Sequence, residues 1–214
     1  MEQVTSSFRA VLFDCDGVLQ RPANDWRAEL LALVPDRVEA EADAFLEDIA
    51  VAERPTMDGK LDFAVRLQEV LDRWAVRTPA TDVLPVWQRL WVDPEMLEAA
   101  ADLRDRGLVC ALGTNQQSYR AAYMQRELGY EQWFDPRFYS CDLGVAKPNP
   151  EYFRIAVRRL GVAPDEVLFV DDVLANVQGA REAGLVAEHF ARDAGRPELD
   201  RILALHGLAE AIAA

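Results

Sequence analysis

The sequence predicts an α/β protein with a doubly wound parallel-sheet core and an inserted small all-helical cap subdomain. Short apolar runs alternate with helix-like segments through most of the chain, and one long connection, residues 20–92, contains helix-like segments only. Strands that alternate with helices form βαβ units, in which the strands pair in parallel. We therefore expect an α/β core made of residues 1–19 and 93–214 and a helical cap made of residues 20–92.

Five apolar runs are expected to be the strands of the sheet. Most of them lack strict alternation of apolar and polar residues, which is typical of strands buried on both faces of a parallel sheet. In chain order they cover residues 9–13, 108–112, 137–141, 166–170 and 185–190.

Four segments between the later runs are expected to be helices of the core. They cover residues 94–107, 118–129, 150–161 and 176–184. The first and the third open near a proline and close with a glycine, an asymmetry typical of helix ends.

The long insert is expected to contain helices and no strand. A connection of this length that is not of low complexity is not an ordinary loop. Its helix-like segments cover residues 26–34, 36–53, 61–76 and 83–91. The insert also carries Trp26, Trp74, Trp87 and Trp91. Aromatic residues at helical spacing usually pack in a core, so we expect packing for these four side chains and not a substrate-binding wall.

Composition excludes several classes of partner. The chain has 50% hydrophobic residues and a formal net charge of -14, which suits a packed core and disfavours binding to nucleic acid or to an anionic membrane. No apolar run is long enough to span a bilayer, and the N-terminus shows no signal peptide. Cys15, Cys110 and Cys141 lack metal-site spacing and are expected to be free thiols. These features predict a cytoplasmic location and set no oligomeric state.

Polar residues follow the first four predicted strands. In chain order they are Asp14 and Asp16, then Thr114 and Asn115, then Lys147, and finally Asp171 and Asp172. The carboxyl ends of parallel strands lie at one edge of the sheet, where ligands bind. Four carboxylates there suit Mg²⁺, a lysine and a threonine suit phosphate oxygens, and a carboxylate can attack phosphorus. The sequence therefore predicts a magnesium and phosphate site at this edge.

Four motifs in this order resemble those of the haloacid dehalogenase superfamily. They are DCDGVL at 14–19, LGTN at 112–115, AKPNPEYF at 146–153 and VDDVLANVQGAREAG at 170–184. The helical insert after the first motif matches the position of that family's small helical cap, so the resemblance covers the whole chain. It implies a Rossmann-like catalytic core.

The resemblance also implies catalytic roles. Asp14 would be the nucleophile that forms a phosphoaspartyl intermediate. Asp16 would protonate the leaving oxygen and would then activate the water that hydrolyses the intermediate. Lys147 would balance the negative charge of Asp14 and of the phosphoryl group.

Binding roles follow from the same resemblance. Thr114, together with the Asn115 backbone amide and Lys147, would hold the phosphoryl group of the substrate. The Mg²⁺ ligands would be Asp14, the main-chain carbonyl of Asp16, and Asp172, with Asp171 acting through water.

Asp16 favours a phosphatase over a dehalogenase, because an alkoxide leaving group needs a proton and a halide does not. The short cap and the stretch that runs from GTNQ to GAREAGL look most like bacterial sugar-phosphate phosphatases, including those that act on glucose 1-phosphate. The expected partner is thus a small phosphorylated metabolite.

Other readings are weaker or remain open. A phosphosugar mutase stays possible, because phosphoglucomutase relatives share all four motifs. A phosphoaspartate signalling or binding module, such as a response-regulator receiver, gathers similar residues but is shorter and has another motif order. An inert relative used for binding has no support, since each motif position holds a competent residue.

Overall fold

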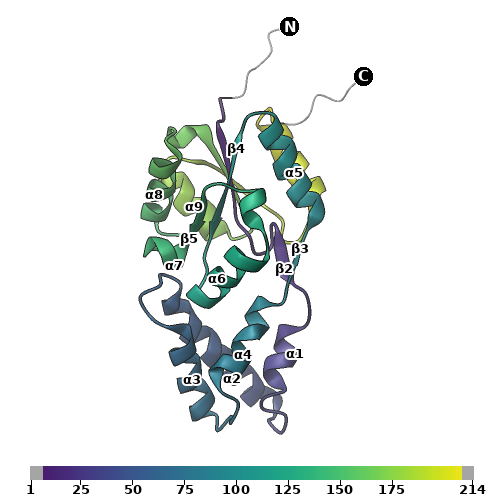
Figure 1. Ribbon diagram of the computed structural model, residues 1–214, viewed down its shortest axis with the longest axis vertical. Helices are drawn as coiled ribbons and strands as arrows, with labels where there is room; N and C mark the ends of the chain where they lie inside the picture. The colour runs from purple at the N-terminus through teal and green to yellow at the C-terminus, as the bar shows by residue number, and fades with distance from the viewer. Residues whose placement is uncertain (1–6, 209–214) are drawn as a thin grey trace.

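The five apolar runs predicted to be strands form the central sheet. The computed structural model describes residues 7–208, so the outermost parts of the predicted core, 1–6 and 209–214, lie outside the described residues. All strand pairs of the sheet are parallel, and the strand order is β5-β4-β1-β6-β7 (Figure 1). The strands are Ala10–Phe13 (β1), Val109–Thr114 (β4), Arg137–Tyr139 (β5), Val167–Asp171 (β6) and Val186–His189 (β7).

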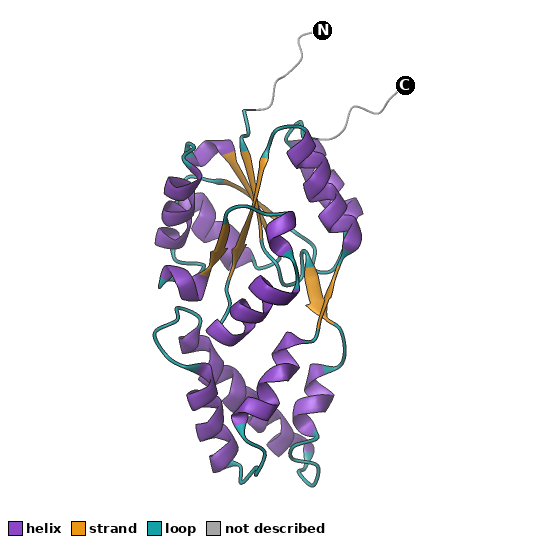
Figure 2. Cartoon of the chain, in the orientation of Figure 1, coloured by secondary structure: helices purple, strands orange, loops and turns teal. Residues whose placement is uncertain are grey.

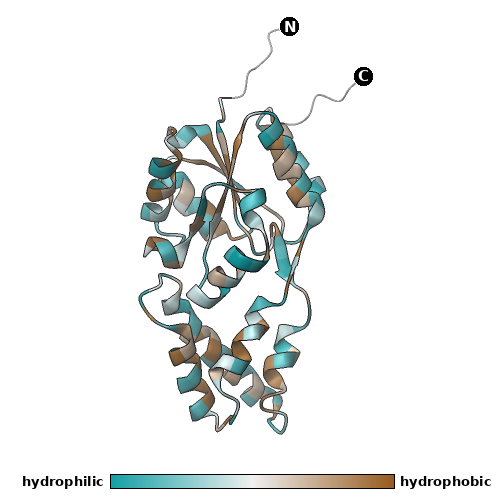
Figure 3. Cartoon of the chain, viewed as in Figure 1, coloured by the Kyte–Doolittle hydropathy of each residue, from teal (hydrophilic) through white to brown (hydrophobic). Residues whose placement is uncertain are grey.

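Both faces of this sheet are buried, which explains why its strands are continuously apolar. Along β1, Val11 and Phe13 pack into one hydrophobic cluster, while Ala10 and Leu12 pack into the other. Successive side chains of a strand point to opposite faces, so a strand covered on both sides needs apolar residues throughout. Figure 3 shows the strands of the sheet as predominantly apolar, whereas most helices have one polar side.

Helices cover the two faces of the sheet in separate layers. The predicted helices form α5 (Pro94–Asp105), α6 (Ser118–Glu127), α8 (Pro150–Leu160) and α9 (Leu174–Glu182), and two further helices are α7 (Ser140–Leu143) and α10 (Arg196–Leu205). Apolar residues of α5, α6 and α10 pack into the cluster that contains Phe13, and those of α8 and α9 into the cluster that contains Leu12. This is the doubly wound arrangement that the sequence predicted.

The insert forms a helical layer beyond the carboxyl ends of the strands (Figure 1). Its helices are α1 (Trp26–Leu31), α2 (Glu39–Glu53), α3 (Phe63–Arg73) and α4 (Ala80–Val83). They share a hydrophobic cluster of their own, which includes Phe45, Phe63 and Leu67, each of them fully buried.

The chain also contains short 3₁₀ turns. Two lie in the insert, at Arg54–Thr56 and Leu84–Gln88, and two in the core, at Tyr130–Gln132 and Pro164–Glu166.

The expectation of no strand between residues 20 and 92 was wrong. Strands β2 (Gln20–Pro22) and β3 (Leu90–Val92) form an antiparallel ribbon that joins the insert to the core (Figure 2). Three residues are too few to show the alternation by which a strand is recognised in sequence. The ribbon forms because the two connections between insert and core run side by side. Its strands lie at the ends of the predicted cap, whose boundaries stay a prediction.

The cysteines are free, as expected, with Cys15 and Cys110 buried and Cys141 half-buried. Cys15 packs in the cluster on the opposite side of β1 from Leu12, so it points away from the Asp14 side of the strand. Within residues 7–208, none of the helices combines the length and the apolar character needed to cross a bilayer. The cytoplasmic location stays a prediction.

Helix α9 packs unusually close to the loop that carries Lys147. A Cβ atom at Gly179 would lie 2.0 Å from the main-chain oxygen of Pro148, well inside van der Waals contact. Glycine at this position therefore lets α9 approach the residue that follows Lys147.

We predict that Gly179→Ala destabilises the protein by about 1–3 kcal/mol, because the added methyl group overpacks this contact. In an ordinary helix the same change would stabilise by up to about 1 kcal/mol. Urea unfolding measures the difference. Gln178→Ala, an exposed position of the same helix, is the control and should change the stability by less than about 0.5 kcal/mol. A Gly179→Ala variant more stable than the parent would contradict the packing argument.

Candidate active site

Lys147 connects the ends of three neighbouring strands of the sheet. Its buried ammonium lies 2.8 Å from Oδ1 of Asp14 and 2.6 Å from Oδ2 of Asp171, and it donates to the main-chain oxygen of Gly113 at 2.7 Å. Burial alone would lower the pKa of Lys147, but the two carboxylates hold that pKa above its usual value. Lys147 is therefore a fixed cation between Asp14 and Asp171.

Asp14 carries the most perturbed carboxyl group of this constellation. Burial raises the pKa of Asp14 above its usual value; Lys147 opposes the rise, and the neighbouring Asp171 carboxylate adds to it. The site holds more negative charge than Lys147 alone can balance. A carboxylate in this position gains from any further cation placed beside it.

Asp171 and Asp172 differ in how many of their oxygens are already bound. Asp171 accepts hydrogen bonds from the Val173 N–H at 2.7 Å and from the Asn176 side chain at 3.1 and 3.0 Å, in addition to the contact with Lys147. Asp172 forms one ion pair, with Arg192, at 3.2 Å. The adjacent carboxylates are therefore unequal: Asp171 is fixed by several neighbours, whereas Asp172, whose side chain is also buried, makes fewer contacts.

Three carboxylates lie close enough to share one metal ion. One oxygen each of Asp14, Asp171 and Asp172 lie within 4.8 Å of one another. An all-oxygen, anionic donor set of this kind fits the hard cation Mg²⁺. The side chain of Asp16 is not part of this cluster.

Gly17 allows the loop after β1 to pass this cluster. Its φ of +84° lies in the left-handed region, and a Cβ atom there would lie 2.5 Å from Oδ2 of Asp172. Glycine is therefore required both by the backbone conformation and by the space next to a carboxylate.

Thr114 and Asn115 lie at the end of β4, as predicted, and make different contacts. The buried Thr114 hydroxyl accepts a hydrogen bond from the Gln116 side chain at 2.9 Å. The Asn115 side chain binds the main chain of Lys147 in both directions, with Nδ2 donating to its oxygen at 2.8 Å and Oδ1 accepting from its N–H at 2.9 Å. Asn115 thus fixes the loop that carries Lys147, and its own backbone amide is not used by this contact.

Asp16 points away from the metal cluster and is held by Arg120, a residue that the sequence reasoning missed. Nη1 and Nη2 of Arg120 donate to Oδ2 and Oδ1 of Asp16 at 2.7 and 2.6 Å. The side chains of Gln116 and Gln20 donate to the same two oxygens at 2.8 and 2.9 Å. Burial on its own would raise the pKa of Asp16, but Arg120 and these hydrogen bonds hold it below its usual value.

One feature of the sequence could have pointed to Arg120. It lies in the first turn of α6, where the helix dipole disfavours a cation, so an anionic partner was to be expected. The residue before it reaches in another direction: the Tyr119 hydroxyl lies 3.1 and 3.0 Å from the two carboxylate oxygens of Asp62, the N-cap of α3. The first turn of α6 therefore contacts both Asp16 and the helical insert.

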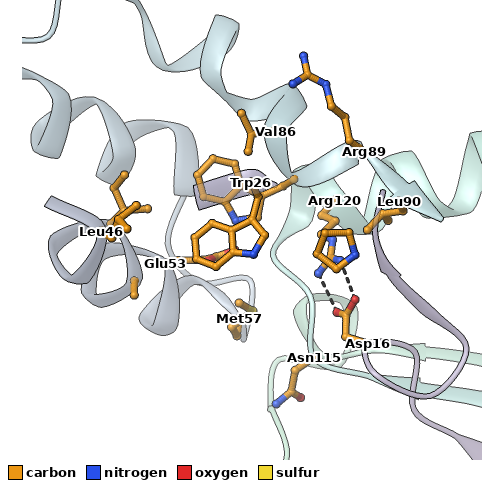
Figure 4. A pocket seen from close by; sticks show the side chains of 14 residues that line it. Asp16, Trp26, Leu46, Glu53, Met57, Val86, Arg89, Leu90, Asn115 and Arg120 are labelled. Atoms are coloured by element: carbon orange, nitrogen blue, oxygen red, sulfur yellow. Dashed lines mark hydrogen bonds and ion pairs between the residues drawn. The ribbon is translucent and has the colours of Figure 1, made fainter. Parts of the chain in front are cut away.

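A cavity of about 270 Å³ lies between the insert and the core (Figure 4). Asp16, Asn115 and Arg120 line its core side, and the insert side is largely apolar but includes Glu53. Burial raises the pKa of Glu53 to about 7. The full lining is Asp16, Pro22, Trp26, Leu46, Ile49, Ala50, Glu53, Met57, Val86, Trp87, Arg89, Leu90, Asn115 and Arg120.

The four tryptophans of the insert do not behave alike. Trp74 packs against the cluster of the insert, as expected, and Arg21 stacks on the ring of Trp91 at 4.4 Å. Trp87 packs against the same cluster and also lines the cavity, and Trp26 lines the cavity with 41% of its surface exposed. The expectation of core packing was therefore wrong for Trp26 and for Trp91, which is 40% exposed in strand β3, and it was incomplete for Trp87. Helical spacing cannot show which side of a helix faces a cavity.

Known proteins with similar sequences include two phosphatases and one longer, bifunctional enzyme. A phosphorylated carbohydrates phosphatase of Thermotoga maritima is 25% identical over 181 residues, 82% of each chain. An N-acetylmuramic acid 6-phosphate phosphatase of Pseudomonas aeruginosa is 30% identical over 82% of this chain and 78% of its own. The rat bifunctional epoxide hydrolase 2 is 32% identical over 44% of this chain, and the match spans only 18% of that longer protein.

A solved structure shows the same fold. The enzyme bt-2542 from Bacteroides thetaiotaomicron, described as a member of the HAD family, superposes with a TM-score of 0.71 at 20% identity and covers 86% of this chain and 94% of its own. At the level of families, residues 8–184 match the haloacid dehalogenase-like hydrolases. The match extends over far more than half of the sequence, and the chain therefore belongs to the haloacid dehalogenase-like hydrolase family.

Proposed function

We propose that this hydrolase is a Mg²⁺-dependent phosphatase that cleaves a small phosphomonoester, specifically a sugar phosphate, through a phosphoaspartyl intermediate on Asp14. The observation that carries the proposal is the position of Asp14 between a buried lysine and a cluster of carboxylates at the end of β1. The names of the two phosphatase relatives support phosphorylated sugars as the substrate class.

In the first step an Asp14 oxygen attacks the phosphorus atom of the substrate. The bond between phosphorus and the leaving oxygen breaks, and its electron pair stays on that oxygen. Asp16, which must take up a proton before this step because its ion pair with Arg120 favours the carboxylate, donates that proton to the leaving oxygen. Lys147 stays within hydrogen-bond distance of Asp14 and balances charge on the transferred group. Thr114 and the Asn115 backbone amide would bind its oxygens.

In the second step water attacks the phosphorus atom of the phosphoaspartate. Asp16, now ionised, takes a proton from this water, and the bond between phosphorus and the Asp14 oxygen breaks. Inorganic phosphate leaves, and both aspartates return to their starting protonation states. Asp171, fixed by Asn176 and Val173, would keep Lys147 in place through both steps.

The carboxylate cluster fits Mg²⁺, which would be held by Asp14, Asp172 and the main-chain carbonyl of Asp16, with Asp171 acting through water. A metal ion bound there supplies positive charge that polarises phosphoryl oxygens. The bonding of Asp171 to Lys147, Asn176 and Val173 supports the indirect role assigned to it.

The presence of Asp16 supports cleavage of a phosphate ester and not of a carbon–halogen bond. Loss of halide requires no proton donor, so a carboxyl group beside the nucleophile has no role in that reaction. The cavity of about 270 Å³ next to Asp16 has room for the leaving group of a small metabolite and is too small for a folded phosphoprotein. These two features together favour a small phosphate ester.

The test of the proposed function is phosphate release from a panel of sugar phosphates, nucleotides and p-nitrophenyl phosphate. We expect release that depends on Mg²⁺, stops with a chelator and is fastest for one sugar phosphate. Halide release from a 2-haloacid serves as the counter-assay. Interconversion of sugar phosphates without free phosphate would instead support a mutase, and halide release alone would support a dehalogenase.

We predict that Asp14→Asn lowers phosphate release by at least about a thousandfold, because the amide cannot act as the nucleophile. The circular dichroism spectrum should stay unchanged, since the substitution preserves the shape of the side chain. Asp58→Asn, an aspartate whose contacts are with Lys60, is the control and should retain activity. A fully active Asp14→Asn variant would exclude Asp14 as the nucleophile.

We further predict that Asp172→Asn raises the Mg²⁺ concentration needed for half-maximal activity by about tenfold to a hundredfold, because it removes one anionic ligand from the site. Titration of phosphate release with Mg²⁺ measures the shift. Asp193→Asn removes an exposed carboxylate outside the cluster and should leave the Mg²⁺ requirement unchanged. An equal requirement in both variants would argue against Asp172 as a ligand.

A further inference from the structure

Arg120 binds both carboxylate oxygens of Asp16, the atoms through which Asp16 would have to transfer a proton. Its guanidinium forms a two-pronged ion pair with Asp16 at 2.6 and 2.7 Å, and two glutamine side chains bind the same oxygens. A group that transfers a proton must come within hydrogen-bond distance of the reacting atom. With all four donors in place, the Asp16 carboxyl cannot turn to the leaving oxygen of a substrate.

The same arginine also faces the cavity where a leaving group would lie. Arg120 lines this cavity together with Glu53 and Trp26, which come from the insert (Figure 4). The Nε–H of Arg120 is buried and has no hydrogen-bond partner among residues 7–208. A buried donor without a partner is costly, so an oxygen atom of a bound molecule would be stabilised there.

Glu53 lines the same cavity as the Arg120 guanidinium. Burial raises the pKa of Glu53 to about 7, so its carboxyl group can act as a hydrogen-bond donor or acceptor near neutral pH. Glu53 comes from the end of α2 in the insert, whereas Asp16 comes from the core. A shift of Arg120 towards the insert would therefore move the guanidinium away from Asp16 and towards the side of the cavity that carries Glu53.

We propose that Arg120 is a specificity-determining residue that holds Asp16 before substrate binds and releases it when a polyhydroxylated leaving group fills the cavity and binds the Arg120 guanidinium. This inference rests on the proposed phosphatase function. It narrows the substrate class to esters whose leaving group is large enough to reach both Arg120 and Glu53.

The lining of the cavity fits such a leaving group. Trp26 and Trp87 offer flat apolar surfaces that suit the C–H faces of a sugar ring, while Arg120 and Glu53 offer a donor and an acceptor for its hydroxyl groups. A phosphate ester with a short alkyl group would reach Asp14 but would leave these contacts unmade. Such an ester would not displace Arg120 from Asp16, and the enzyme would cleave it slowly.

The experiment compares two substrates in the Mg²⁺-loaded enzyme: the best sugar phosphate of the panel and ethyl phosphate. We expect Arg120→Met to lower the ratio of their kcat/KM values by about tenfold or more, which is the usual worth of a hydrogen bond to a charged group. The rate for the sugar phosphate falls because a contact is lost, and the rate for ethyl phosphate does not fall because Asp16 is free. Arg120→Lys keeps the charge but not the two-pronged geometry. The ratio of kcat/KM values for this variant should therefore lie between that of the parent enzyme and that of Arg120→Met.

Gln20→Leu is the control: it removes one hydrogen bond to Asp16 without changing the cavity lining. Gln20 donates to the same carboxylate but does not line the cavity, so its removal should change both rates by the same factor. A ratio that is unchanged in both Arg120 variants, with both rates lowered equally, would show a purely structural role and overturn the inference. No phosphate release from either ester by the parent enzyme would instead overturn the proposed function, and this inference with it.

Discussion

The ammonium of Lys147 is the contact on which the site depends. Its side chain is fully buried between Asp14 and Asp171 and balances carboxylates that could not otherwise be buried together. Several local features serve to place it. Asn115 binds its main chain in both directions, and Gly179 gives α9 the room to pack against the residue after it. The parallel strands bring these distant segments to one edge because their carboxyl ends align.

The sheet and the residues at its edge could be predicted from sequence, because both depend on local or strictly periodic signals. A strand covered on both faces must be apolar throughout, so each run was visible on its own. The direction of the strands then brought Asp14, Thr114 and Asp171 to the same edge without knowledge of any side-chain contact. The division of metal-binding roles between the two neighbouring aspartates, Asp171 and Asp172, stays a prediction.

The remaining features depend on contacts between segments that no local pattern encodes. The β2–β3 ribbon forms only because two distant connections run side by side, and three residues per strand give no period. The pairing of Arg120 with Asp16 joins positions 104 residues apart. The role of Trp26 in lining a cavity depends on how the insert is oriented over the core, which the spacing of aromatic residues does not determine.

The first turn of α6 places two consecutive side chains on different parts of the molecule. Tyr119 contacts the N-cap of an insert helix, and Arg120 contacts Asp16 in the core. A helical insert transplanted from a relative would thus contact a core whose residues 119 and 120 match this chain's own insert and not the new one. Exchange of substrate preference between members of this family by grafting the insert would require residues 119 and 120 to be transferred with it, although they lie outside the grafted segment.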